Sequence, residues 1–270
     1  MQENRIILSI SSDIGFELAK VWHKRGHNVY GTYRNYSDKC KLLSSMGVKL
    51  FHCDLNKTYT IKNVIKKINK EFKWDVVVLA AGNQEPVSSF IECKFEEWES
   101  SIISNFTAQL RFLHGILKNR NNDYKKIPKV LFFAGGGTNN ATLNYSAYTI
   151  SKIASIKICE LLDAEIHDTS FSILGPGWVK TKIHKATFKA KNKAGDNYTR
   201  TKKIFKNKDF FPMSEVINCC DWVLSSSKEL VGGRNFSAVF DPWKSDKINL
   251  INNDINNFKL RRFGNHLFDD

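Results

Sequence analysis

The segment RIILSISSDIGFELAKVW, residues 5–22, begins as a short apolar run and ends with the periodicity of an amphipathic helix. Small polar residues lie between the two parts, so the segment predicts a strand, a tight turn and a helix. Such a turn places hydroxyls, a carboxylate and free backbone N–H groups at a helix N-terminus, where the helix dipole favours a pyrophosphate. The turn therefore predicts a dinucleotide site made by Ser9, Ser11, Ser12, Asp13, Ile14 and Gly15. Asp13 also fits an ordinary helix N-cap.

The alternation of strand and helix continues along the chain. Further strands are predicted within residues 26–34, 48–55, 74–82, 127–134, 169–174 and 232–243, and helices near residues 60–72, 95–120, 145–167 and 212–224. This pitch is typical of an α/β protein with a Rossmann-type, doubly wound parallel sheet of about seven strands and helices on both faces. Ligands bind such a sheet at the carboxyl ends of its strands.

Length and composition bound the class of protein. The 270 residues, 42% of them hydrophobic, suffice for one large core, and we predict a single domain over residues 1–270. The six cysteines lack a C-x-x-C pair and the seven histidines lack metal-ligand spacing, so we expect reduced thiols and no metal site. We find no signal peptide and no run of 18 apolar residues, and we expect a cytoplasmic protein without a membrane span.

A Tyr-x-x-x-Lys pattern, Tyr148 and Lys152, lies inside the helix predicted over residues 145–167. Four residues apart on a helix, the phenol and the ammonium project from one face, one turn apart. A phenol ionises at about pH 10, and a nearby cation favours the phenolate and lowers that pKa toward the range of an acid–base catalyst. The pair predicts proton transfer to or from a carbonyl oxygen; an ordinary amphipathic face is the alternative.

The end of the second predicted strand bears on the choice of cofactor. In a dinucleotide fold this position meets the adenosine ribose, where an acid would bind the 2′-hydroxyl and an arginine would bind a 2′-phosphate. Tyr33 and Arg34 lie there, with no acidic residue beside them. The sequence thus predicts NADP(H) in preference to NAD(H).

Taken with these features, the order of Asp54-Leu55, Ala81-Gly82, Asn105 and Pro176-Gly177-Trp178-Val179-x-Thr181 resembles the classical short-chain dehydrogenase/reductase family. The likeness covers about residues 4–240. It implies an NAD(P)-dependent oxidoreductase, a carbonyl reductase or alcohol dehydrogenase, that works as a homodimer or tetramer paired through its two long helices.

The resemblance also implies a role for individual residues. Tyr148 matches the family's general acid–base, and Lys152 matches the residue that lowers its pKa and holds the nicotinamide ribose. Asn105 matches the anchor of a proton-relay water, and Arg34 matches the arginine for the 2′-phosphate. Further cofactor contacts are implied for Asp54 and Leu55 at the adenine, for Thr181 at the nicotinamide carboxamide, and for Ala81, Gly82, Pro176, Gly177 and Val179.

One catalytic position departs from the family. A substrate-binding serine is expected about a dozen residues before the tyrosine, and Ala134, Gly135 and Gly136 stand there instead. Thr138 is the nearest substitute hydroxyl, and Ser146 is a poorer one. A glycine-lined backbone could also present N–H groups as an oxyanion hole.

The formal charge of +14 is concentrated after residue 179. In this family the segment after the Pro-Gly turn is the substrate lid, here about residues 182–211, and it contains Lys182, Lys185, Lys189, Lys191, Lys193, Arg200, Lys202, Lys203, Lys206 and Lys208. A lid this basic predicts an anionic substrate, such as a phosphorylated or nucleotide-activated sugar. The alternative is a solvated helix whose lysines contact nothing.

The remaining sequence bears on the wider role of the protein. The C-terminal extension, about residues 241–270, begins with Asp241-Pro242-Trp243 and resembles family members from surface-polysaccharide pathways, which favours carbohydrate biosynthesis. Nucleic acid is not an expected partner, because the sequence has no zinc finger, basic heptad region or RNP-like strand. Two other classes stay open: a catalytically impaired nucleotide-binding or scaffold protein, and an epimerase or dehydratase.

Overall fold

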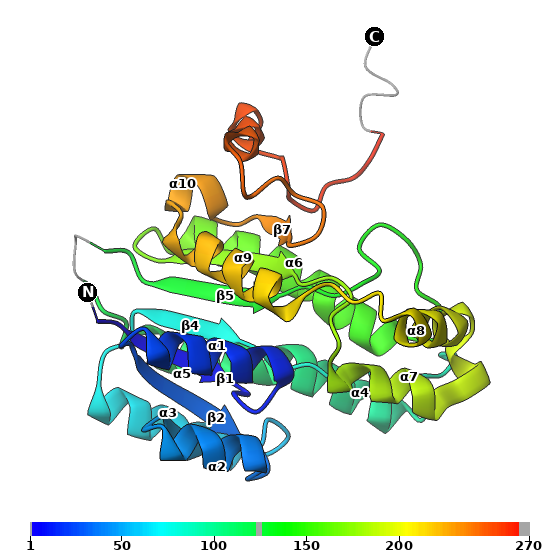
Figure 1. Ribbon diagram of the computed structural model, residues 1–270, viewed down its shortest axis with the longest axis horizontal. Helices are drawn as coiled ribbons and strands as arrows, with labels where there is room; N and C mark the ends of the chain where they lie inside the picture. Colours follow the sequence, from blue (N-terminus) through cyan, green and yellow to red (C-terminus); the bar gives the residue numbers. More distant parts are fainter. Residues whose placement is uncertain (1, 123–125, 265–270) are drawn as a thin grey trace.

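The computed structural model describes residues 2–122 and 126–264, in which one parallel sheet of seven strands is the centre of the fold (Figure 1). The strands lie in the order β3-β2-β1-β4-β5-β6-β7. Their bounds are β1 Asn4–Leu8, β2 Asn28–Tyr33, β3 Lys49–His52, β4 Val76–Leu79, β5 Lys129–Phe133, β6 Ser170–Gly175 and β7 Asn235–Ser237. The order reverses between β1 and β4, which is the topological switch point of a doubly wound sheet. The predicted fold class is therefore confirmed.

Helices cover both faces of the sheet, because the central strands carry apolar side chains on both sides. On one face Ile7 of β1 packs with α1 (Asp13–Lys24) and α9 (Met213–Ser225). On the other face Ile6 and Leu8 pack with α3 (Thr58–Glu71), α5 (Ala108–Leu117) and α6 (Ser146–Glu165). The other α-helices described outside the lid are α2 Asp38–Ser45, α4 Phe95–Ile102 and α10 Lys228–Val231.

Two regions differ from the sequence prediction. The helix expected over residues 95–120 is interrupted by a π-helical turn, η1 (Ile103–Thr107), between α4 and α5. The lid, predicted only as a basic segment, folds as η2 (Lys182–His184), α7 (Lys185–Ala190), η3 (Lys191–Ala194) and α8 (Asp196–Asn207). Figure 1 shows α7 and α8 beyond the carboxyl ends of the strands, the end at which ligands bind this fold.

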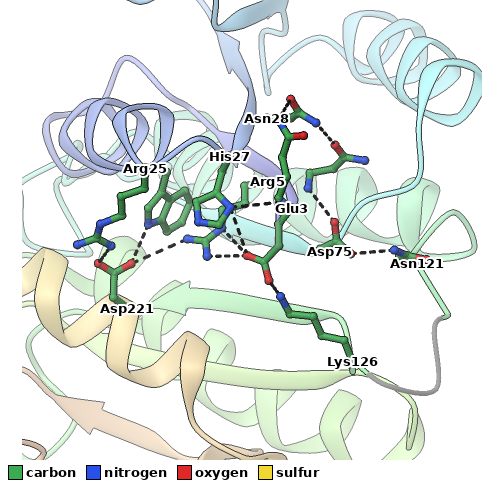
Figure 2. Close-up of polar contacts among 12 residues, drawn as sticks. Glu3, Arg5, Arg25, His27, Asn28, Asp75, Asn121, Lys126 and Asp221 are labelled. Atoms are coloured by element: carbon green, nitrogen blue, oxygen red, sulfur yellow. Dashed lines mark hydrogen bonds and ion pairs between the residues drawn. The ribbon is translucent and has the colours of Figure 1, made fainter.

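The opposite, amino edge of the sheet is held by charged side chains (Figure 2). The buried Glu3 carboxylate accepts from Arg5 at 2.6 Å and also pairs with Lys126. The Arg5 guanidinium lies 4.5 Å from the centre of the Trp22 indole. Asp221 of α9 accepts from the Trp22 N–H at 2.7 Å and from Arg25 at 2.6 Å. These contacts join β1, α1 and α9 at the end of the molecule away from the lid.

The C-terminal extension continues from β7 into η4 (Asp246–Asn253) and returns toward α6. There Arg261 pairs with Glu160 at 2.6 Å. The predicted extension also includes residues 265–270, which lie outside the described residues. No helix in the described part of the chain has the length and apolar character needed to cross a membrane.

Candidate active site

The carboxyl ends of β1, β4, β5 and β6, with the start of α6 and the lid, border a cavity of about 1340 Å³. Many of the predicted site residues line it: Ser12, Asp13, Ile14, Ala81, Gly82, Thr138, Tyr148, Lys152, Pro176, Gly177, Val179 and Thr181. The other predicted residues, all of them described, lie outside its lining: Ser9, Ser11, Gly15, Arg34, Asp54, Leu55 and Asn105. The cavity thus unites the predicted catalytic pair with the predicted nicotinamide contacts.

Tyr148 and Lys152 lie on the first two turns of α6 and are both buried. The Lys152 Nζ donates a hydrogen bond of 2.9 Å to the Phe133 carbonyl at the end of β5. It lies 5.8 Å from the centre of the Tyr148 ring. The helical spacing therefore brings the two groups together as predicted, with the ammonium anchored on the neighbouring strand.

The pKa values of the pair differ from the prediction. Burial raises the pKa of Tyr148 to about 12 and lowers the pKa of Lys152 to about 8. The prediction that Lys152 lowers the pKa of the phenol is wrong, because desolvation of the buried ring dominates and the ammonium is directed to Phe133. At neutral pH the phenol is therefore protonated, the form that a proton donor requires.

Gly135 occupies the place of the absent serine and is in contact with the catalytic pair. A Cβ added there would lie 2.9 Å from the Tyr148 Oη and 2.8 Å from the Lys152 Cγ. Both distances are below normal contact, so no side chain fits unless Tyr148 or Lys152 moves. The absence of the serine is therefore accompanied by a different local packing, in which the phenol lies close to the Gly135 backbone.

Three hydroxyls lie near this point, and they are not equivalent. Thr138 lines the cavity, as predicted for the nearest substitute. The Ser146 hydroxyl instead accepts from the Trp98 indole at 3.0 Å, and Ser146 is outside the cavity lining. Sequence reasoning missed Thr149, which lines the cavity and whose buried Oγ1 has no hydrogen-bond partner among the described residues. The sequence feature that could have indicated Thr149 as a site residue is its position directly after Tyr148.

Asn105 lies buried in the π-helical turn η1, and its side chain holds the segment after β4. Its amide accepts from the Asn83 N–H and donates to the Asn83 carbonyl, both at 2.8 Å. The Asn105 carbonyl accepts from the Gln109 side chain at 2.8 Å. The Gln109 side chain thus binds a backbone carbonyl of the π-helical turn. Periodicity alone does not reveal this contact, because Gln109 falls on the apolar stripe.

The turn after β1 contains a serine where the backbone conformation favours glycine. Ser9 adopts a left-handed backbone with φ of 66°, a conformation that costs a non-glycine residue on the order of 1 kcal/mol. The Ser12 hydroxyl accepts the Gly15 N–H at 3.1 Å, so Ser12 and not Asp13 caps α1. The N-cap alternative for Asp13 is therefore wrong.

Asp13 instead joins the turn to the lid. Its carboxylate accepts from the Lys39 ammonium and from the Lys182 backbone N–H, the latter at 2.6 Å, and the Lys182 ammonium donates to the Ser11 carbonyl at 3.1 Å. Burial alone would raise the pKa of Asp13, but these hydrogen bonds and the two lysine charges outweigh it and lower the pKa. The carboxylate is thus ionised and held between two cations.

Arg34 and Asp54 lie at the carboxyl ends of adjacent strands, because Tyr33 of β2 is in register with His52 of β3. Arg34 is exposed and has no ion-pair partner among the described residues. Asp54 accepts from the Asn56 N–H at 3.1 Å, and its backbone bonds to Thr60. Both side chains lie at the end of the sheet where the adenosine half of a dinucleotide binds in this fold.

The lid contacts the body of the protein through polar and aromatic groups. The Tyr145 hydroxyl lies 2.7 Å from that of Thr187, and the His184 ring stacks on Trp178 with 5.0 Å between centres. Of the lysines and arginines in residues 180–208, Lys182 and Arg200 line the cavity. Most of the predicted basic charge therefore lies on the outer side of the lid.

Comparison with known proteins gives the same fold. A family model described as enoyl-(acyl carrier protein) reductase matches residues 10–238. A short-chain dehydrogenase/reductase from Saccharomyces cerevisiae is 21% identical, with a TM-score of 0.77 over 90% of this chain and 98% of that one. A short-chain dehydrogenase from Shigella flexneri 2a str. 301, complexed with NADP, is 18% identical, with a TM-score of 0.71 over 88% and 98%.

A variant of actinorhodin polyketide ketoreductase with NADPH is 19% identical, with a TM-score of 0.74 over 87% of this chain and 95% of that one. No curated protein matches the chain. The matched family model extends from the turn after β1 to the end of β7, so it includes the cavity and the Tyr148–Lys152 pair. The chain belongs to the short-chain dehydrogenase/reductase family of oxidoreductases.

Proposed function

We propose that the protein is an NADP(H)-dependent carbonyl reductase or alcohol dehydrogenase whose substrate is an anionic, phosphorylated or nucleotide-activated sugar. The observation that carries the proposal is the buried Tyr148–Lys152 pair, which faces the same cavity as Ala81, Gly82 and the 176–181 turn. A proton donor and a nicotinamide-binding surface at one cavity are the two requirements for reducing a carbonyl group.

The residues present fit a dinucleotide. The first turn of α1 keeps the N–H groups of Ser11, Asp13 and Ile14 free of protein acceptors within the described chain, as a pyrophosphate requires. Exposed Arg34, with no acid beside it, supports NADP(H) over NAD(H). Similar structures were solved with NADPH, NADP and NADH, so the preference rests on Arg34.

Proton transfer follows from the state of Tyr148. The hydride for the carbonyl carbon comes from the bound nicotinamide. Tyr148, with a pKa of about 12, donates its proton to the carbonyl oxygen as negative charge develops there. Lys152 and Asn105 are the residues expected to reload the phenol. The protonated phenol is the form that carbonyl reduction requires.

An anionic substrate is supported by Arg200. Its guanidinium lies over the Trp178 indole, 5.0 Å from the ring centre, and it forms no ion pair within the described residues. Because Asp196 and Asp209 line the same cavity, we propose Arg200, and not the whole lid, as the contact for the anion. The outer lysines would then raise the rate of encounter with an anion.

Cofactor binding is the first test. Fluorescence titration is expected to show NADPH binding at least tenfold tighter than NADH, and Arg34→Asp is expected to remove most of that difference while leaving NADH binding intact. Equal binding of both nucleotides by the unmodified protein would contradict the assignment of Arg34. Binding of neither would contradict the enzyme proposal.

The substrate proposal has its own test. Arg200→Gln is expected to raise KM for phosphorylated carbonyl compounds about tenfold, the loss of one charge-assisted contact, and to leave KM for their dephosphorylated forms unchanged. Lys203→Gln, an exposed lid lysine outside the cavity lining, is the matched control. An equal effect of Arg200→Gln on both substrate classes would contradict an anion site.

A second candidate is a nucleotide-binding protein with impaired catalysis. The observation that favours it is the glycine at residue 135, where the family serine is absent and where a side chain does not fit. Such a protein would bind NADPH without oxidising it in the presence of any carbonyl compound. Turnover of one carbonyl substrate would support an active enzyme and contradict this second candidate.

A homo-oligomer is also part of the proposal. Phe95 on α4 and Ile150 and Leu161 on α6 are exposed apolar side chains on the two helices expected to pair. Light scattering during size-exclusion chromatography is expected to give a dimer or tetramer, and Leu161→Glu is expected to shift it toward monomer.

A further inference from the structure

We propose that the backbone N–H groups of Gly135, Gly136 and Gly137, in the loop between β5 and α6, form an oxyanion hole for the substrate carbonyl. These groups would take the role of the absent serine. The inference rests on the proposed reaction, because the oxygen bound is the one that Tyr148 protonates.

The hydrogen-bond pattern of the loop provides the first support. The Ala134 N–H donates to the Leu174 carbonyl at 3.0 Å, which is the last contact of β5 with β6. Among the described residues, no acceptor receives the N–H of Gly135, Gly136 or Gly137. The three glycines line the cavity and none of them is fully buried, so these N–H groups are available to bind an anion there.

The second support is the position of these donors relative to the acid. The Tyr148 Oη lies 2.9 Å from the point where a Gly135 Cβ would stand, so the phenol oxygen lies beside the Gly135 backbone. An oxygen that accepts a proton from Tyr148 therefore comes close to the loop. Fixed donors beside the atom at which charge develops are the requirement for oxyanion stabilisation.

The loop conformation also depends on glycine at its third position. Gly137 has φ of +94°, a left-handed conformation that L side chains rarely adopt. A Cβ there would lie 2.6 Å from the Thr149 Cγ2 and 2.9 Å from the Thr142 Oγ1. The loop is thus packed against the first turn of α6, which distinguishes it from a slack glycine-rich connection.

The glycine amides can be observed directly. Protein labelled with ¹⁵N-glycine is saturated with NADP⁺, which cannot reduce a ketone, and then titrated with 1,1,1-trifluoroacetone while amide spectra are recorded. The expected result is a downfield proton shift at Gly135, Gly136 and Gly137, with the distant Gly26 and Gly47 unchanged. Saturation without a shift at the three loop glycines would overturn the proposal.

Two variants test the same loop by rate. Gly137→Ala displaces the loop and is expected to lower kcat for the best carbonyl substrate by about 10²–10³-fold, the usual effect of losing an oxyanion donor, with NADPH affinity unchanged. Gly26→Ala is the matched control, because Gly26 has φ of +85° and no atom within 4 Å of an added Cβ. It carries similar backbone strain and is expected to keep full activity.

Gly135→Ser restores the family residue and separates the two explanations. The added Cβ displaces Tyr148 from the loop N–H groups. If these groups bind the substrate oxygen, kcat is therefore expected to fall. A tenfold rise in kcat would show that a hydroxyl was simply missing and would overturn the proposal. Failure of NADP⁺ to bind at all would instead refute the proposed function, so the two failures are distinguishable.

Discussion

At the scale of single residues, burial decides the chemistry of Tyr148 and Lys152. Neither side chain has a carboxylate partner within residues 2–122 and 126–264, and both are nearly inaccessible to solvent. Each is therefore biased toward its neutral form: the phenol keeps its proton and the ammonium loses its proton at about pH 8. At neutral pH the phenol is therefore protonated, and the Lys152 ammonium still keeps most of its charge.

The buried ammonium has a cost in stability. A pKa lowered from 10.5 to about 8 corresponds to a cost on the order of 3 kcal/mol for keeping Lys152 charged at neutral pH. We predict that Lys152→Met raises the free energy of unfolding by about 2 kcal/mol at pH 7, since one hydrogen bond to Phe133 is lost in return. Urea unfolding measures the difference, and Lys157→Met, exposed on the same helix, is the control.

The gain in unfolding free energy expected for Lys152→Met decreases as pH rises. Between pH 8 and 10.5 the unfolded chain keeps the Lys152 proton while the folded chain releases it, so the unmodified protein gains stability as pH rises through that window. The advantage of Lys152→Met is therefore expected to be largest below pH 8 and to shrink toward pH 10.5. A constant advantage would show that the charge of Lys152 is not the cause.

The sequence predicts single residues well where local geometry sets them. Because Tyr148 and Lys152 are four residues apart, helix periodicity places them on one face, and the structure brings them to one cavity. The direction of the Tyr148 pKa was predicted wrongly, because desolvation depends on what the rest of the chain packs over the ring. Thr149 was missed for the same reason: only the fold shows that its hydroxyl is buried without a partner.

At the scale of elements, the π-helical turn η1 is the feature that periodicity could not predict. It inserts into a helix whose apolar stripe continues on both sides, in α4 and α5. The fold explains it through Asn105, whose side chain pairs with both backbone groups of Asn83. The turn therefore positions the segment that follows β4 at the edge of the cavity.

This role predicts a stability effect. Asn105→Ala leaves the Asn83 N–H and carbonyl without their partners, and it is expected to lower the free energy of unfolding by about 2–3 kcal/mol. Asn253→Ala, an exposed asparagine in η4, is expected to change it by less than about 0.5 kcal/mol. Urea unfolding of both variants checks the prediction. A neutral Asn105→Ala would mean that solvent replaces these hydrogen bonds fully.

Prediction at the same scale also failed in part at the turn after β1. The order of strand, turn and helix was predicted, and the structure has it. The contact of Asp13 with Lys39 and Lys182 was not, because these residues lie 26 and 169 positions away. Asp13, for which the sequence also allowed a helix cap, instead links the turn after β1 to the lid.

At the scale of the whole molecule, the two ends of the sheet have different tasks. The carboxyl edge holds the cavity and the lid, and the amino edge holds the charged network of Glu3, Arg5, Lys126 and Asp221 (Figure 2). Strand and helix patterns predicted the sheet, its parallel sense and the edge at which the site lies. The amino-edge network was not predictable, since it joins side chains from opposite ends of the chain.

The network is expected to contribute measurably to global stability. Glu3→Gln leaves the partly buried Arg5, whose pKa burial lowers to about 10, without its closest carboxylate. Breaking a buried pair from one side is expected to cost about 3 kcal/mol in thermal or urea unfolding. Glu17→Gln, which removes a surface pair with Lys20, is the control with an expected change below about 0.5 kcal/mol. Equal losses of unfolding free energy in the two variants would mean that the Glu3 contacts stabilise the fold no more than the surface pair does.

The most direct test of the central claim, that Tyr148 protonates a carbonyl group as NADPH is consumed, is single-turnover NADPH oxidation monitored by absorbance with carbonyl compounds that do and do not carry phosphate. The unmodified protein is expected to oxidise NADPH with at least one phosphorylated compound. Tyr148→Phe is expected to slow this step on the order of 10³-fold while binding NADPH with unchanged affinity. Tight NADPH binding without oxidation across the series, or an undiminished rate in Tyr148→Phe, would contradict it.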